Sequence, residues 1–157
     1  MTVKIWKPKV QNETPPGDIF GDKDSSYIAA GQFEGIQLLV SCFYTVMSEL
    51  PEAAHIRDMH PADLTVSIDK LTCFLSGWLG GPRLYADKYG AFSIPQVHKH
   101  LVVTELERDA WLLCMHEALD QQPYSQSFKK YMLKQLAIPA ERIRLTCTAA
   151  NSQSGAD

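Results

Sequence analysis

The chain has 157 residues, and its 45% hydrophobic content is enough to form one core, so we expect a single domain. Fifteen basic and 18 acidic side chains give a net charge of −3, and no basic cluster alternates with aromatic residues, which argues against a nucleic-acid partner. The longest apolar stretch, residues 36–47, is interrupted by Gln37 and Ser41 and is too short to span a bilayer. Because the N-terminal residues also lack a secretory apolar core, we expect a cytoplasmic protein with no membrane partner.

Hydrophobic periodicity predicts helices along the chain and gives almost no signal for strands. Residues 1–24 contain several prolines and glycines without lasting periodicity, so we expect a loosely ordered extension. A short helix is expected to begin at Ser25 or Ser26 and to close at Gly31.

Two stronger helices follow in the first half of the chain. Apolar residues within 36–50 recur every three or four positions, and Pro51 comes directly after them. Residues 51–63 form a polar connection. A third helix places its apolar residues within 64–79 and ends at Gly80-Gly81-Pro82, because glycine favours a left-handed cap and proline cannot continue the helix.

The second half of the chain predicts three further helices. A short one surrounds Pro95 and His98, and the next opens with Thr104 and Glu107 at capping-box spacing. The last helix follows Pro123 and is expected to end before Pro139. We therefore predict an all-α domain over residues 25–145 and a flexible polar tail over residues 146–157.

The four cysteines (Cys42, Cys73, Cys114 and Cys147) are widely separated and form no CxxC pair. Three of them lie on apolar helix faces. We interpret them as buried free thiols in a reducing compartment rather than as metal ligands or disulfides.

The histidines are the first candidates for chemistry. His98 and His100 would share a face on a strand and could then bind zinc, but on a helix they point about 200° apart. His98 is spaced three or four positions from Ile94, Leu101 and Val102, so it is the inward-facing member of the pair. Its imidazole is either a hydrogen-bonded core histidine or a ligand to a group held in the core.

Two other polar side chains lie on apolar helix faces, Tyr44 beside Phe43 and Trp111 beside Cys114. A buried tyrosine hydroxyl and a buried indole N–H each require an acceptor. A helical pocket with one imidazole and two converging donors suits a metal-bound ligand that carries partial negative charge.

Five segments together resemble the truncated haemoglobins of group II: "FY" at 43–44, "MHP" at 59–61, "DKLTCFLSGWLGGPRLY" at 69–85, His98, and "ERDAWLLCMH" at 107–116. The resemblance covers residues 27–136. It implies a two-over-two helical sandwich around non-covalent haem b (iron protoporphyrin IX). It further implies that His98 is the proximal iron ligand and metal-binding residue, and that Tyr44 and Trp111 are distal donors, with His60 as a third donor candidate.

The resemblance also assigns wall and edge residues. Ser67 stands where vertebrate globins place a distal histidine, and the expected pocket residues are Phe43, Ser67, Leu71, Phe74, Leu101 and Met115. Lys70, Arg83 and Tyr85 are candidates to hold the haem propionates by charge-assisted or hydroxyl hydrogen bonds, although Lys70 and Arg83 could equally be solvated surface charges. Two positions depart from the family pattern: Gln32 follows Gly31 where a glycine pair is usual, and Leu101 replaces an aromatic residue.

Three functions remain open at this stage. The first is a haem protein that binds O2, CO or NO reversibly, and the second is an enzyme that turns over peroxide or NO at the same iron, as a peroxidase or an NO dioxygenase does. The third is a helical interaction module without haem, which the joint presence of His98, Tyr44 and Trp111 disfavours. Two or three distal donors argue against a protein that readily unloads oxygen. A reductase partner and a monomeric or homodimeric state are compatible with the sequence.

Overall fold

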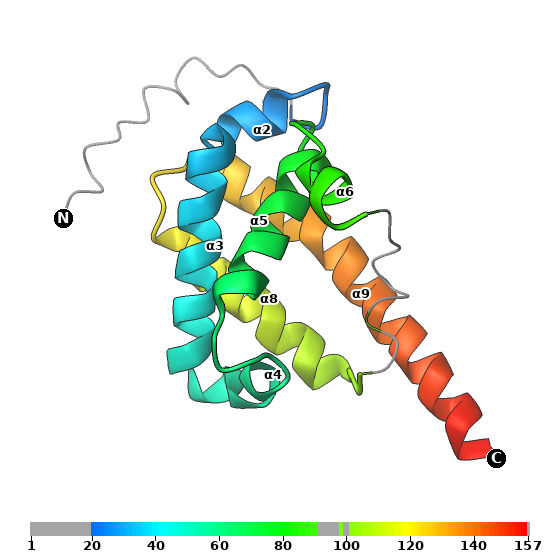
Figure 1. The fold of residues 1–157 in the computed structure, drawn as a ribbon. Helices are drawn as coiled ribbons and strands as arrows, with labels where there is room; N and C mark the ends of the chain where they lie inside the picture. The colour runs from blue at the N-terminus through cyan, green and yellow to red at the C-terminus, as the bar shows by residue number, and fades with distance from the viewer. Residues whose placement is uncertain (1–19, 91–97, 99–100, 157) are drawn as a thin grey trace.

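The structure, a computed structural model, describes residues 20–90, 98 and 101–156. Its elements are α2 (Ser25–Ala29), α3 (Gln32–Glu49), the 3-10 turn η2 (Pro51–Ala53), α4 (Ala54–Asp58), α5 (Thr65–Trp78), α6 (Leu84–Tyr89), α8 (Glu105–Asp120) and α9 (Gln126–Ala156). Within this described part every element is helical, which confirms the all-α prediction. The helices α3 and α5 lie in front of α8 and α9 in Figure 1, so two helix pairs form the two layers expected.

The first layer is built around α3, whose predicted apolar face is buried. Ile36, Val40 and Phe43 are fully buried, as are other members of the three-and-four spacing. This face packs against both α5 and α8, so α3 lies at the centre of the fold. The helix ends at Glu49, because Leu50 is extended and Pro51 follows.

The entry to α3 is a left-handed corner at two successive residues. Gly31 has φ 90°, which glycine adopts without steric cost, and Gln32 has φ 60°, which is unfavourable for a residue with a Cβ. The departure from the glycine pair noted in the sequence therefore places a strained residue at this corner.

The double glycine after α5 allows the chain near α2 to pack closely. Gly80 has φ 96°, and a Cβ there would lie 2.0 Å from the carbonyl oxygen of Lys23. A Cβ on Gly81 would lie 2.4 Å from the ring of Tyr27. Only glycine fits at these two positions. The Gly80-Gly81 pair that ends α5 therefore also allows the segment around Lys23 and Tyr27 to pack against it.

The capping box predicted for α8 is present. The Thr104 side chain accepts a hydrogen bond from the amide of Leu106, and the Glu107 carboxylate accepts one from the Thr104 amide at 2.7 Å. These bonds satisfy amides at the start of α8 that have no partner within the helix.

Two expectations about the helices were wrong, and one helix was not predicted. The connection 51–63 contains η2 and α4, and the chain after Pro82 contains α6. These helices have six residues or fewer, which is too short for a periodic apolar pattern to emerge. The last helix continues through Pro139 to Ala156 rather than ending before Pro139.

The long helix α9 packs its C-terminal part into the core and also contacts the N-terminal part of the described chain. Pro139 cannot donate a backbone hydrogen bond, yet α9 runs through it without a break; Leu136, three residues earlier, is buried in the core, and the helix packs along α8. Cys147, inside the segment expected to form the tail, is fully buried. At the other end, the ring of Phe20 contacts Phe128 of α9 with ring centroids 5.2 Å apart.

The predicted helix around Pro95 lies outside the described residues, except for His98, which has helical geometry. Within the described part of the chain, no helix is long and apolar enough to cross a membrane. The four cysteines are free, as predicted.

Candidate functional site

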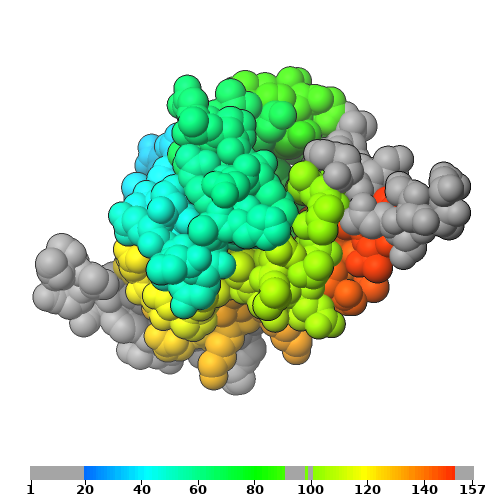
Figure 2. Space-filling view, turned by 90° about the horizontal axis from the view of Figure 1, so that it is seen from below, coloured from blue at the N-terminus to red at the C-terminus, as the bar shows by residue number. Residues whose placement is uncertain are grey.

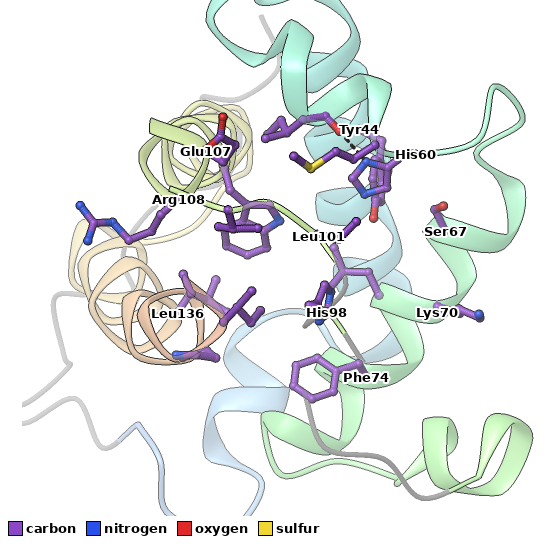
Figure 3. Close-up of a pocket in the computed structure, with 18 of the residues that line it drawn as sticks. Tyr44, His60, Ser67, Lys70, Phe74, His98, Leu101, Glu107, Arg108 and Leu136 are labelled. Carbon is purple, nitrogen blue, oxygen red and sulfur yellow. Dashed lines mark hydrogen bonds between the residues drawn. The ribbon is translucent and has the colours of Figure 1, made fainter. Parts of the chain in front are cut away.

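A cavity of about 400 Å³ lies between the helix layers. Its walls come from α3, α4, α5, α6, α8 and α9, together with His98 and the segment after it. Figure 2 shows one outer face of this region, with the N-terminal part of α8 between the α4–α5 corner and the C-terminal half of α9. Figure 3 shows the interior, where Tyr44 and His60 lie together at one end and Ser67, Lys70 and Phe74 follow α5.

His98 lines this cavity, as predicted for an inward-facing imidazole. The backbone beside it is held by two bonds to its own carbonyl oxygen, from the Leu101 amide at 2.9 Å and from the Cys147 thiol at 3.0 Å. The wall on this side is completed by α9 through Leu136, Pro139, Ala140 and Ile143. The sequence could not reveal this wall, because Pro139 was taken as the end of the helix.

Tyr44 and Trp111 line the same cavity from α3 and α8. The ring of Phe43 lies 5.0 Å from each of their rings, centroid to centroid, and fixes their positions from behind. Burial raises the pKa of the Tyr44 hydroxyl to about 12, so this group remains a protonated donor at physiological pH. Among the residues that the structure describes, neither the Tyr44 hydroxyl nor the Trp111 indole N–H has a hydrogen-bond acceptor.

His60 lies beside Tyr44, with ring centroids 5.5 Å apart. Its Nδ1 is 2.8 Å from the carbonyl oxygen of Ile56, and since a carbonyl can only accept, Nδ1 carries the proton. Burial lowers the pKa of the imidazole below its usual value, so the ring is neutral. In this neutral tautomer Nε2 is an acceptor, so the His60 ring, which lines the cavity, lacks the free N–H that a donor role needs.

The remaining candidates divide into lining and supporting residues. The cavity is lined by Ser67, Leu71, Phe74 and Leu101, and by Lys70 and Tyr85 at its edge. Phe43 and Met115 are fully buried and lie behind the wall rather than on it. Arg83 is exposed and does not line the cavity, because its Cα packs on Gly77 of α5 at the start of α6.

Glu107 is a cavity residue whose part in the site the sequence did not reveal. Besides closing the capping box with Thr104, its carboxylate contacts Nδ1 of His55 at 2.6 Å and thereby joins α4 to α8. Burial raises the pKa of this carboxyl, but the hydrogen bonds from Thr104 and His55 outweigh burial and hold the pKa below its usual value. The capping-box spacing identified Glu107 as a helix cap and gave no sign of the contact to α4.

The donor set of the cavity is that of a haem site rather than of a protein-only metal site. No group of three or more His, Cys, Asp or Glu side chains able to hold a metal ion occurs in the described part of the chain. One imidazole, an apolar wall and two unpaired donors instead fit a flat apolar cofactor that brings its own four metal ligands. Lys70 and Tyr85 at the edge fit the carboxylates that such a cofactor carries.

Comparisons with known proteins agree with this geometry. The family model described as "Bacterial-like globin" matches residues 25–144. The group 2 truncated hemoglobin YjbI of Bacillus subtilis is 29% identical over 120 residues, which is 76% of this chain and 88% of that protein.

Solved structures give the same result. The group II 2-on-2 hemoglobin of Agrobacterium tumefaciens is 34% identical, with a TM-score of 0.72 over 76% of this chain and 92% of its own. A truncated oxygen-avid haemoglobin of Bacillus subtilis is 30% identical, with a TM-score of 0.69 over 75% of this chain and 97% of its own. The chain therefore belongs to the bacterial-like globin family, as a truncated haemoglobin of group II.

Proposed function

We propose that the protein binds haem b non-covalently through His98 and holds O2, with CO and NO as alternative ligands, beneath Tyr44 and Trp111. The family itself implies haem binding. The observation that carries the finer assignment is the pair of donors, buried Tyr44 and half-buried Trp111, which have no acceptor among the described residues and share one cavity with His98. When bound, haem would supply an iron able to take up a diatomic ligand.

In this proposal Tyr44 and Trp111 donate the hydrogen bonds that stabilise bound O2. O2 in such a site carries partial negative charge, and a buried donor to a charged group contributes about 1.5–3 kcal/mol. Tyr44 and Trp111 are both positioned before any ligand arrives, because Phe43 packs against both rings. Slow O2 release follows, and the similarity to a relative described as oxygen-avid supports the same expectation.

The proximal assignment is tested by removing the imidazole. His98→Ala should lose tight haem retention, measured by the Soret band and by the rate of haem transfer to a competing apoprotein. His116→Ala is the matched control, because His116 is exposed on α8, does not line the cavity, and pairs with Glu117 and Asp120 of its own helix. An unchanged spectrum and transfer rate in His98→Ala would exclude His98 as the iron ligand.

A peroxide-consuming enzyme is the second candidate function, and the tautomer of His60 favours it. A neutral imidazole that lines the cavity and has its Nδ1 proton bonded to Ile56 keeps Nε2 as the acceptor that could take a proton from hydrogen peroxide, as a general base does. NO dioxygenation would use the same cavity but requires no such base.

His60→Leu separates the two candidate functions. The variant removes the acceptor and keeps an apolar side chain of similar bulk, so it should slow the reaction with peroxide by about 10²- to 10⁴-fold while CO binding changes little. Stopped-flow mixing with peroxide measures the effect. Equal peroxide rates in both proteins would remove the support for a peroxidase role.

A further inference from the structure

One face of α9 continues beyond the part of the chain that matches the globin family. Leu136, Ala140, Ile143 and Cys147 are spaced by four, three and four positions and therefore lie on one side of the helix. The first three line the cavity, and Cys147 is fully buried. The family match ends at residue 144, so Cys147 extends the cavity face of the helix by one turn past the family domain.

This extra turn brings a thiol to the backbone of the proximal segment. The Cys147 Sγ donates to the carbonyl oxygen of His98 at 3.0 Å, and the same oxygen accepts from the Leu101 amide at 2.9 Å. Carbonyl groups at the end of a helix lack amide partners within the helix and need them from elsewhere. A carbonyl oxygen can only accept, so the Cys147 thiol is the donor of this contact.

We propose that Cys147 is a positioning residue for the proximal histidine: its thiol holds the His98 carbonyl and so restrains the backbone that carries the imidazole. This inference rests on the proposed function, because it treats His98 as the iron ligand. Two bonds to one carbonyl oppose rotation of the peptide that follows His98. The restraint limits the tilt of the imidazole toward the iron, as outer-shell hydrogen bonds do for metal ligands in general.

Cys114 provides a matched control within the same molecule. It is also fully buried, in the middle of α8, and its thiol has no hydrogen-bond partner among the residues that the structure describes. Removing its sulfur takes the same volume from the core without touching the proximal segment. Effects that arise from Cys147 but not from Cys114 therefore belong to the contact with His98.

The test uses the full chain with four single changes. Cys147→Ser keeps a donor, Cys147→Ala removes the donor, Cys147→Val removes it but restores bulk, and Cys114→Ala is the control. The iron–histidine stretching band of the ferrous protein reports the imidazole, and amide hydrogen exchange at Leu101 reports the backbone with and without haem. Cys147→Ala and Cys147→Val should shift or broaden the band and speed Leu101 exchange by about two- to tenfold, the effect of one lost hydrogen bond. Cys147→Ser and Cys114→Ala should leave both readouts close to those of the unmodified protein.

Two results would overturn the proposal. One is an unchanged band and unchanged Leu101 exchange in both Cys147→Ala and Cys147→Val. The other is a Cys147→Ser protein that behaves like Cys147→Ala, which would assign the effect to sulfur packing rather than to the donor. Absence of the iron–histidine band from the unmodified protein would instead remove the proximal assignment of His98, and the exchange measured in haem-free protein would distinguish that failure from the first two.

Discussion

At the scale of single residues, the site depends on which polar groups find partners inside the protein and which do not. The Tyr44 hydroxyl and the Trp111 N–H lack acceptors in the described chain, whereas Nδ1 of His60 is already bonded to Ile56. Because an unpaired buried donor is costly, the first two groups are available for a ligand. The neutral His60 can only complement them as an acceptor.

Removing each donor while keeping the ring should therefore change ligand release. Trp111→Phe and Tyr44→Phe should each speed O2 dissociation by about ten- to a hundredfold, because one buried hydrogen bond to a partly charged ligand is lost. Stopped-flow displacement of O2 by CO measures the rates. CO carries less charge on its terminal atom, so its own dissociation serves as the internal control and should change much less.

The double variant tests whether the two donors act independently. Both rings contact Phe43, so a change at one ring can move the other, and the two effects need not add. Unchanged O2 dissociation in both single variants would contradict a distal role for these residues and leave a water molecule as the remaining donor.

At the scale of elements, the close backbone approaches, the His55–Glu107 contact and the strained residue of this chain all lie at the ends of helices rather than in their interiors. Gly80 and Gly81 admit Lys23 and Tyr27 at distances that no Cβ would allow, and Glu107 joins α4 to the start of α8. The corner before α3 is different, since Gln32 has a left-handed backbone without being glycine. Such a residue stores strain of about 1 kcal/mol.

Gln32→Gly should relieve this strain. We expect an increase of about 0.5–1 kcal/mol in the free energy of unfolding, somewhat reduced by the greater freedom of glycine in the unfolded chain. Urea unfolding followed by circular dichroism measures it. Gln32→Ala is the control, because alanine keeps the Cβ and hence the strain; equal stabilisation by alanine would show that the backbone angle is not the cause.

At the scale of the whole molecule, the main feature is the cavity between the two helix layers. A cavity of about 400 Å³ with apolar walls is a cost to the folded state unless a cofactor occupies it. A group that binds only the folded state adds its binding free energy to the stability of the protein.

Removal of haem should thus lower the stability of the entire domain. At a haem concentration a thousand times its dissociation constant the loss is about 4 kcal/mol, visible as a lower Tm in thermal unfolding of the haem-free protein. His98→Ala prepared without haem should unfold near the haem-free unmodified protein, because both lack the cofactor. The same Tm with and without haem would contradict occupancy of this cavity.

The amino-acid sequence was sufficient to predict three of the long helices and the central chemical groups. The apolar faces of α3, α5 and α8 and the capping box at Thr104 depend on spacings of three and four residues, which are local and can be counted along the chain. The same spacing, together with the family motifs, selected His98, Tyr44 and Trp111, and all three line one cavity.

Only the tertiary structure decided the features that depend on residues far apart in the sequence. The contact of Cys147 with His98 spans 49 positions, and that of His55 with Glu107 spans 52. Pro139 looked like a helix end because its local cost is visible in the sequence, whereas the packing of α9 along α8 that offsets this cost is not. The tautomer of His60 is a local feature that the residue type still does not specify, since the carbonyl oxygen of Ile56, four residues earlier, places the proton on Nδ1.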